Sequence, residues 1–343
     1  MNEVRACVLS VQYRYFALAM VLIALALMAD ARPTFPTALA IAAGGSAVAE
    51  ALRAHGVVRV TRALSKSEAA ALMEAVDLSL ADALQATKGN EIDSEQWQSR
   101  FGDIMSPRNR HDVKLSLEAP PVRAALASLL GTLEPALSAS LGEDALLHEL
   151  AALISLPGAR RQPIHPDTPI KEGSGTDQGP VILTGFCALQ DIDASMGPTL
   201  FLPSTHTAEA HAAFFTYENF DLYISSTSDE DEDELDAEHE TRVSAQLESL
   251  EPWHSELCTG DVSLFDSRCL HAGDANTSQR RRYLFYFSFI KAPHADATTT
   301  YATMLESLRG KHKLGEWRQW LCVQSASGAA TPGAQVLAEG APL

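Results

Sequence analysis

The sequence has little cysteine and an excess of acidic over basic residues. Its 343 residues include five cysteines. None is part of a Cys-x-x-Cys pair, so neither a zinc ribbon nor a thioredoxin-like motif is indicated. Four cysteines outside the N-terminal segment are too few for a disulfide scaffold in a chain of this length. With 26 Lys and Arg against 44 Asp and Glu, the formal net charge is −18. A surface of this sign repels phosphate backbones, so we expect no nucleic-acid partner.

Long apolar runs are also scarce, and the N-terminal one is shorter than the ~20 residues that a membrane span needs. It covers residues 15–27, follows Arg5 and Arg14, and is followed by small residues at 29 and 31. We therefore predict that residues 1–31 are a signal peptide or other targeting segment, which implies the secretory pathway or an endomembrane lumen. The alternatives are a membrane anchor, a composite organelle-targeting sequence and a misplaced start codon. No stable membrane span is expected after cleavage.

The acidic residues are unevenly distributed. Residues 229–240 contain nine acids and no Lys or Arg, which is half of the net charge. We predict a solvated surface insertion over residues 228–240, between two strands. A docking site for a basic partner is the alternative. The small and polar residues 323–343 predict a disordered tail.

The first part of the chain is helical in pattern. An Ala-rich segment, residues 37–55, ends at Gly56, and residues 57–60 form a short strand. Ser65 and Glu68 form a capping box that starts a helix ending near residue 87. A strand is expected at 113–117, and a helix at 120–141 that is broken or bent near Gly131 and Pro135.

From residue 146 onward the apolar runs become short and are bounded by Gly and Pro. Such runs are typical of strands in one all-β core. The expected strands are residues 146–156, 181–189, 199–202, 262–265 and 283–290. One amphipathic helix, about 301–321, is expected to follow them.

The first chemical signal is Ile164-His165-Pro166-Asp167. In an extended segment, side chains two positions apart point to the same side, so His165 and Asp167 can reach one metal ion. Alone, this pattern also fits a polar pair in a surface loop beside a proline.

The second signal is a hairpin. A turn at residues 260–261 leads into a strand, and His271 follows it. A polar turn over residues 272–278 then leads to Arg282, which opens an aromatic strand. The hairpin therefore places His271 and Arg282 on adjacent strands.

Two histidines and one carboxylate predict a facial triad for Fe(II), which leaves three coordination positions open. Two of these positions suit 2-oxoglutarate, and the third suits O₂. The far carboxylate of 2-oxoglutarate requires a fixed cation, and the guanidinium of Arg282 provides two-pronged pairing. We expect the Ser278 hydroxyl to add a donor to the cosubstrate.

These motifs resemble the phytanoyl-CoA dioxygenase family of Fe(II)/2-oxoglutarate-dependent oxygenases, from about residue 56 to 290. The resemblance rests on His165-Pro166-Asp167, on the Gly-Pro stretch at 197–206, and on the Gly-Asp…His…Arg stretch at 260–282. Where the family often has Gly-Ser-His, this chain has Ser204-Thr205-His206.

The resemblance implies a mainly β fold: a double-stranded β-helix (a jelly-roll, cupin-like core) with N-terminal helices, within one catalytic domain over residues 32–322. It also implies a basic residue near the cosubstrate, for which Lys114 is the candidate. The implied activity is hydroxylation of a small organic substrate, with 2-oxoglutarate and O₂ converted to succinate and CO₂. Related halogenases have a small residue at the carboxylate position, so Asp167 favours hydroxylation.

Two other functions fit parts of the pattern. A catalytically idle jelly-roll could bind a ligand, but it has no reason to keep His165, Asp167, His271 and Arg282 together. A secreted cupin-like protein with another metal would not need Arg282. The sequence leaves the substrate and the oligomeric state open.

Overall fold

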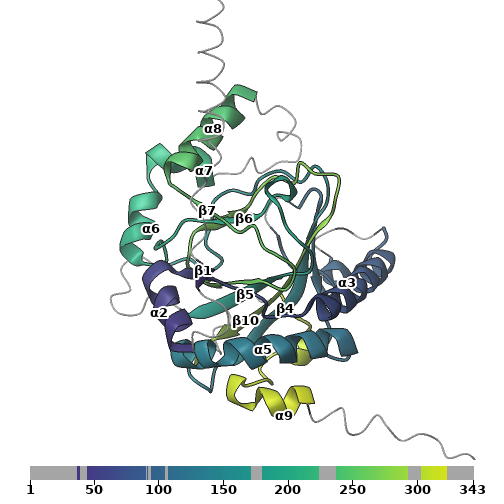
Figure 1. Cartoon of the computed structure of the whole chain (residues 1–343). Helices are drawn as coiled ribbons and strands as arrows, with labels where there is room; N and C mark the ends of the chain where they lie inside the picture. The colour runs from purple at the N-terminus through teal and green to yellow at the C-terminus, as the bar shows by residue number, and fades with distance from the viewer. Residues whose placement is uncertain are drawn as a thin grey trace, which may run out of the picture.

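The computed structural model describes residues 37–38, 45–89, 91, 94–104, 107–170, 180–223, 237–292 and 303–322. Two β-sheets face each other in this part of the chain, with helices outside the larger one (Figure 1). The predicted targeting segment, 1–31, and the predicted tail, 323–343, lie outside the described residues.

The larger sheet has seven strands in the order β1-β2-β8-β5-β10-β4-β3. All neighbours in it are antiparallel except β1 and β2. The strands are β1 Thr37–Ala38, β2 Val57–Val60, β3 Arg110–Lys114, β4 Leu146–Ser155, β5 Ile182–Ala188, β8 Val262–Asp266 and β10 Arg282–Ile290. The five strands expected of the β-core agree with β4, β5, β6, β8 and β10 to within a residue or two at each end.

The smaller sheet contains β6 Thr199–Phe201, β7 Trp253–His254 and β9 His271–Gly273, in the order β7-β6-β9. His165 extends it through a bridge to His271. From β4 onward the chain passes back and forth between the two sheets: β4, β5, β8 and β10 lie in the larger sheet, and β6, β7 and β9 in the smaller one. This alternation builds a double-stranded β-helix, as expected, and mainly antiparallel β-structure with supporting helices is confirmed.

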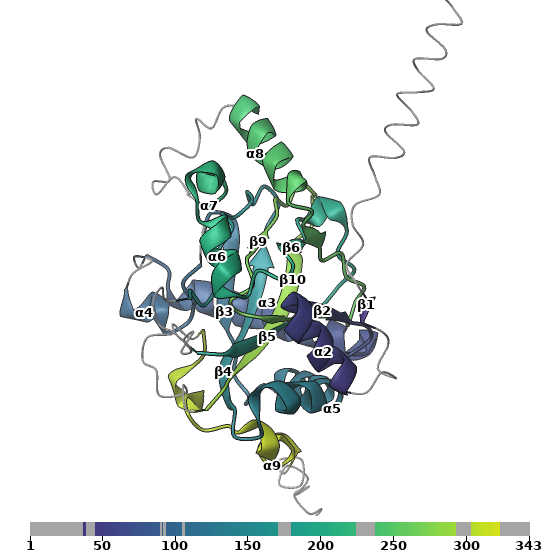
Figure 2. The ribbon, with the colours of Figure 1, turned by 90° about the vertical axis from the view of Figure 1, so that its left-hand side faces the viewer.

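The helices α2 Gly45–His55, α3 Lys66–Ala86, α5 Pro120–Leu141 and α9 Trp317–Cys322 lie on the outer side of the large sheet (Figures 1 and 2). The capping box that starts α3 is present: the Ser65 hydroxyl accepts from the Glu68 amide, and the Glu68 carboxylate accepts from the Ser65 amide. Shorter helical segments are α4 Glu95–Gln98, α6 Ala208–Phe214, α7 Phe220–Tyr223 and the 3₁₀ turns η1 Ala194–Met196 and η2 Tyr217–Asn219.

Helix α5 continues through Gly131 and Pro135, so the expected break is absent. Nine of its side chains are buried against the sheet and the other helices, and this packing outweighs the backbone hydrogen bond that a proline removes. Among the described residues, α5 is the one helix long and apolar enough to cross a membrane by length and composition alone. A buried core helix has the same composition.

Two other expectations differ from the structure. Helix α2 begins at Gly45, and β1 precedes it, so residues 37–55 are not one helix. The helix expected over 301–321 is wrong: η5 Glu306–Leu308, η6 Leu314–Glu316 and α9 occupy this part of the chain. Gly310, with φ +67°, interrupts helical backbone between them. Helix α8 Ala237–Ser249 begins inside the acidic insertion predicted over 228–240. Residues 224–236 lie outside the described part, and the insertion stays a prediction.

Strand β10 divides the core between its two faces. Tyr283, Phe285, Phe287 and Phe289 pack outward, in the hydrophobic cluster that includes α3 and α5. The alternate residues Leu284 and Tyr286 pack inward, in the cluster between the two sheets. Because side chains alternate along a strand, Arg282 and Ser288 share this inner face. The inner face of β10 is therefore a wall with an arginine at one end and hydroxyl groups further along.

Candidate metal and cosubstrate site

His165, Asp167 and His271 come together between the two sheets, although more than a hundred residues separate the two histidines along the chain. One side-chain donor atom from each lies within 4.8 Å of the other two. The distances to Asp167 Oδ1 are 3.8 Å from His165 Nε2 and 3.5 Å from His271 Nε2. The sequence-based prediction that these three side chains converge is thus met by the geometry.

The backbone holds the two histidines together. The amide of His165 donates to the carbonyl of His271 at 3.0 Å, and the amide of His271 donates back at 2.9 Å. The imidazole rings lie 4.7 Å apart, centre to centre. Asp167 follows two residues after His165, and its side chain reaches the same side. The backbone pairing of His165 and His271 therefore positions the side chains of the site.

Each imidazole is oriented by its other nitrogen. Nδ1 of His165 donates to the carbonyl of Pro163 at 2.8 Å, and Nδ1 of His271 donates to the carbonyl of Cys269 at 2.9 Å. These hydrogen bonds place the proton on Nδ1 and leave the Nε2 lone pairs facing Asp167, which is the usual arrangement of metal-binding histidines.

Burial keeps both imidazoles neutral. It lowers the pKa of His165 to about 4, with a further contribution from His271, and it lowers the pKa of His271 to about 4. Burial also raises the pKa of the Asp167 carboxyl, and the nearby His165 opposes this shift. Neutral imidazole is the form that binds a metal ion, and a bound dication would favour the ionised carboxylate.

This donor set fits Fe(II). Ligand atoms about 2.1 Å from one ion lie roughly 3 Å apart when they share a face of an octahedron. The separations of 3.5 and 3.8 Å to Asp167 are close to that value, so small side-chain rotations would suffice. His165, Asp167 and His271 would hold the iron and leave its other positions for ligands from solution.

Arg282 opens β10 and is completely buried. Its guanidinium donates to the carbonyl of Gly197 and to the Ser155 hydroxyl, the latter at 3.0 Å. Burial lowers the pKa of Arg282 to about 9, with Arg110 adding to the effect, so the group is still charged at neutral pH. Among the described residues no carboxylate lies within ion-pair distance of it. A buried cation without a counter-ion indicates a site for an anionic ligand.

Gly273 leaves room for the side chain of Gln162 next to the guanidinium. A Cβ atom at this position would lie 2.6 Å from Gln162 Oε1 and 3.6 Å from Arg282 Nη2. Arg110, which the sequence analysis did not single out, also contacts this region. Its guanidinium donates to the carbonyls of Arg160, Gly273 and Asp274, the last two at 3.5 and 3.4 Å. Two arginines therefore make this end of the barrel positive.

The other two predicted cosubstrate residues have contacts of their own. The Ser278 hydroxyl donates to Asn276 Oδ1 at 2.7 Å and accepts from the Arg280 amide at 3.1 Å, within the β9–β10 turn. The Lys114 ammonium donates to the carbonyl of Gln98 at 2.5 Å. Neither contact involves the triad or Arg282, and the roles assigned to Ser278 and Lys114 stay predictions.

Further polar residues on the inner wall escaped the sequence analysis: Asp112 on β3, Glu149 on β4 and Tyr286 on β10. Both oxygens of Asp112 accept from the Tyr286 hydroxyl at 2.9 Å. Glu149 accepts from the Ser288 hydroxyl at 2.8 Å. A signal for Glu149 was available, because it is the one acid within the apolar segment 146–156.

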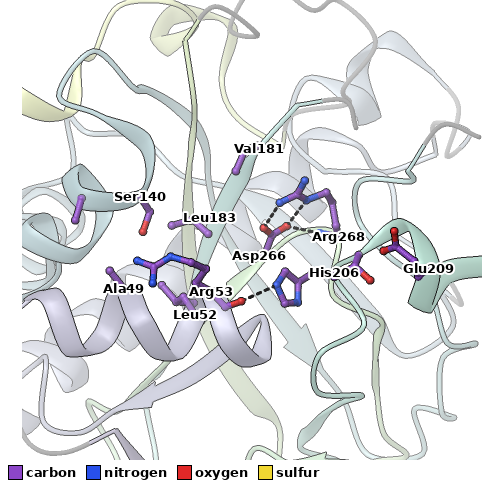
Figure 3. A pocket seen from close by; sticks show the side chains of 12 residues that line it. Ala49, Leu52, Arg53, Ser140, Val181, Leu183, His206, Glu209, Asp266 and Arg268 are labelled. Carbon is purple, nitrogen blue, oxygen red and sulfur yellow. Dashed lines mark hydrogen bonds and ion pairs between the residues drawn. The ribbon is translucent and has the colours of Figure 1, made fainter. Parts of the chain in front are cut away.

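A separate hollow of about 410 Å³ lies at the surface, between α2, the end of α5 and strands β5 and β8 (Figure 3). Its charged pair, Asp266 and Arg268, is joined at 2.6 Å, and the ring of His206 faces the carbonyl of Arg53. No residue of the triad lines it. His206 therefore belongs to this separate hollow and not to the triad.

A double-stranded β-helix that encloses two histidines and one carboxylate defines the class of non-haem Fe(II) oxygenases. The phytanoyl-CoA dioxygenase family model matches residues 52–283. This match spans more than half of the chain, and the chain belongs to that family. Enzymes of the family use Fe(II) and 2-oxoglutarate, and the two histidines and one carboxylate that would hold the iron are present here. A search of curated proteins finds no match.

Several solved structures resemble the chain at low identity. The α-ketoglutarate-dependent carbocyclase SnoK from nogalamycin biosynthesis is 18% identical, with 78% of this chain and 93% of that one covered and a TM-score of 0.44. The epimerase SnoN from the same biosynthesis is 18% identical, with coverage of 87% and 92% and a TM-score of 0.41. EvdO2 from Micromonospora carbonacea var. aurantiaca is 17% identical, with coverage of 71% and 89% and a TM-score of 0.45. Likenesses this distant carry no argument about the reaction.

Proposed function

We propose that this enzyme hydroxylates a small organic substrate, with 2-oxoglutarate and O₂ converted to succinate and CO₂. The observation that carries the proposal is the joint presence, in the same barrel, of the His165-Asp167-His271 triad and a buried Arg282 that has no ion-pair partner among the described residues. The triad supports metal binding, and Arg282 supports binding of a carboxylate at a fixed point.

The residues of the chain have separable tasks. His165, Asp167 and His271 hold Fe(II), and iron with 2-oxoglutarate supplies the oxidising chemistry. Arg282 fixes the far carboxylate of 2-oxoglutarate, and Ser155 and Gly197 fix the guanidinium. The side chains of Phe201 and Phe265 pack against the ring of His271 and shield that side of the site from water.

Asp167 supports hydroxylation over halogenation, because its carboxylate fills the position that a halide would need. A catalytically idle jelly-roll is the competing function. An idle protein would not need neutral imidazoles that face a carboxylate. It would also not need an arginine that is buried without an ion-pair partner among the described residues.

The test is release of succinate from 2-oxoglutarate by the Fe(II)-loaded protein across a metabolite panel, with product mass spectrometry for the gain of one oxygen atom. Asp167→Ala is expected to lower turnover by more than the roughly 10–100-fold loss that follows changes to a ligand's supporting partners. Asp144→Ala is the matched control, since Asp144 is exposed and pairs with Lys313. Equal turnover in wild type and Asp167→Ala would disprove the ligand assignment, and a product without added oxygen would disprove hydroxylation.

A further inference from the structure

Two carboxylates on the inner wall of the barrel have no part in the site described above. Asp112 is 5% exposed, and its oxygens accept from the Tyr286 hydroxyl and, at 3.2 Å, from the Thr303 hydroxyl. Glu149 is half-buried and accepts from the Ser288 hydroxyl. Strands β3, β4 and β10 are neighbours in the large sheet, so these groups form one cluster.

No cation forms an ion pair with this cluster among the described residues, although the charge of Lys114 lowers the pKa of Asp112. Neither Asp112 nor Glu149 has a Lys, Arg or His within ion-pair distance there, and the Lys114 ammonium is engaged by the Gln98 carbonyl. Burial raises the pKa of Asp112 to about 7 and that of Glu149 to about 8. Buried acids that lack a counter-ion are costly for the fold, and they are more common at binding sites than in structural cores.

The cluster faces the metal triad. The negative charge of Asp167 contributes to the raised pKa of both Asp112 and Glu149, so the three carboxylates lie within electrostatic reach of one another. Glu149 is only partly buried, so its carboxylate is open to a ligand. Beside it, Thr184 pairs with Ser288 across β5 and β10, and the buried Thr184 hydroxyl has no hydrogen-bond partner among the described residues. An unsatisfied polar group next to the acids is a second indication that a ligand binds at this wall.

Groups of opposite charge occupy different positions along this inner wall. Along the inner face of β10, Arg282 comes first, Tyr286 is four residues further, and Ser288 six. At about 3.4 Å per residue, Ser288 is roughly 20 Å from Arg282 along the strand. The Arg282 end receives an anion, and the two acids follow along the wall, with Asp112 level with Leu284 and Glu149 level with Ser288. A carboxylate offers about four lone-pair positions, and the donors to Glu149 described here fill fewer than that.

We propose that Glu149, supported by Asp112 and Tyr286, binds a positively charged group of the substrate, an ammonium or a guanidinium. The inference rests on the proposed function, because it takes the space between the two sheets beside the triad as the substrate site. The bound cation would be the missing counter-ion of the two acids, and it would hold the substrate beside the metal through a charge-assisted hydrogen bond. Glu149 is thereby a specificity-determining residue for a cationic substrate class.

The test uses three linear probes of equal length: hexylammonium, hexan-1-ol and hexanoate. Their dissociation constants are measured at pH 8.5 by calorimetry or ligand-observed NMR, on the Zn(II)-loaded protein without 2-oxoglutarate. We expect hexylammonium to bind more tightly than the neutral and anionic probes. Glu149→Gln, which keeps the shape of the side chain, is expected to weaken hexylammonium about tenfold to a hundredfold and to change hexan-1-ol by less than about twofold.

Glu118→Gln is the matched control, because Glu118 is exposed in the loop before α5. It is expected to bind all three probes as the wild type does, which separates binding at Glu149 from general attraction to an acidic surface. Tyr286→Phe removes one hydroxyl and provides a second variant if Glu149→Gln does not fold; it is expected to weaken hexylammonium severalfold.

Equal binding of the three probes, or equal weakening by Glu118→Gln and Glu149→Gln, would overturn the cation site. The proposed function is tested separately, by 2-oxoglutarate binding and turnover with Fe(II). Glu149-dependent cation binding without turnover would uphold this inference and reject the hydroxylase. Turnover without cation preference would do the reverse.

Discussion

Arg282 and Glu149 are single residues whose positions in β10 and β4 place a charged side chain inside the barrel. Arg282 opens an apolar strand and Glu149 lies within one, and both point into the barrel. Arg282 is compensated by carbonyl and hydroxyl oxygens, and Glu149 by hydroxyl and amide hydrogens. Neither has an opposite charge beside it among the described residues, so each is expected to bind its counter-ion from solution.

Replacing Arg282 by Gln is expected to raise the KM for 2-oxoglutarate about tenfold to a hundredfold, because a charge-assisted pair contributes about 1.5–3 kcal/mol. Two neighbours provide the controls. Arg280 is exposed and pairs with Asp193, and Arg281 is exposed and lies 3.6 Å from Asp77. Steady-state kinetics of the three Gln variants decides the matter. Similar small changes in all three would mean that Arg282 does not anchor the cosubstrate.

The raised pKa values of Asp112 and Glu149 predict how stability depends on pH in the metal-free protein. The folded state holds protons on these groups up to about pH 7 and 8, whereas the unfolded state releases them near pH 4. The folded state binds more protons in this window, so the free energy of unfolding falls as pH rises from about 4 to 8. Glu149→Gln should reduce that fall by about 1–3 kcal/mol.

Urea denaturation with a chelator present, at pH 5, 6.5 and 8, measures this dependence. Glu118→Gln should follow the wild-type curve because its carboxylate is exposed. If Glu149→Gln also follows the wild-type curve, Glu149 is not the group that holds the proton.

The metal site was predictable from the sequence and the acidic cluster was not, for a physical reason. His165 and Asp167 are two residues apart, and the spacing of His271 and Arg282 fits one hairpin, so local geometry joins each pair. Asp112, Glu149 and Tyr286 come together through the pairing of β3, β4 and β10. That register depends on contacts between residues up to 174 positions apart, and no local spacing encodes it.

Among the elements, the helices show where local signals suffice. Helix α3 starts where its capping box predicts, because the signal and its effect are a few residues apart. The break expected in α5 is absent, because buried leucines on one face hold the helix across Pro135. The helix expected over residues 301–321 is replaced by short turns around Gly310. Helix boundaries that depend on packing are therefore less predictable than those set by a cap.

Ser65→Ala is expected to lower the free energy of unfolding by about 0.5–2 kcal/mol, because it removes the side-chain acceptor of the capping box. Ser79→Ala is the control within the same helix. Ser79 bonds back to the carbonyl of Ala75, and alanine is the better helix former, so this variant should be unchanged or slightly more stable. Chemical denaturation of both variants gives the comparison. A loss for Ser79→Ala as large as that for Ser65→Ala would argue against the cap.

At the scale of the whole molecule, a metal ion would join two segments that lie far apart in the chain. His165 and Asp167 precede β5, and His271 follows β8. An ion that binds the folded state and not the unfolded one stabilises it by about 2.7 kcal/mol at a hundredfold excess over its dissociation constant.

Adding Fe(II) under anaerobic conditions should therefore raise Tm by several degrees. Asp167→Ala should show a much smaller rise, and Asp144→Ala should match the wild type. Differential scanning calorimetry measures this difference. The same rise in all three proteins would place the metal elsewhere.

The paired amides and carbonyls of His165 and His271 have a consequence for the identity of the metal. Since the backbone sets the ligand positions before any ion arrives, the site has little means of rejecting other ions by shape. Two imidazoles and a carboxylate follow the general order of divalent affinities, in which Fe(II) binds more weakly than Co(II), Ni(II) or Cu(II). The fold therefore permits mismetallation, and the ion that occupies the site depends on which divalent ions are available. Protein purified without added iron is expected to carry a tighter-binding, inactive ion.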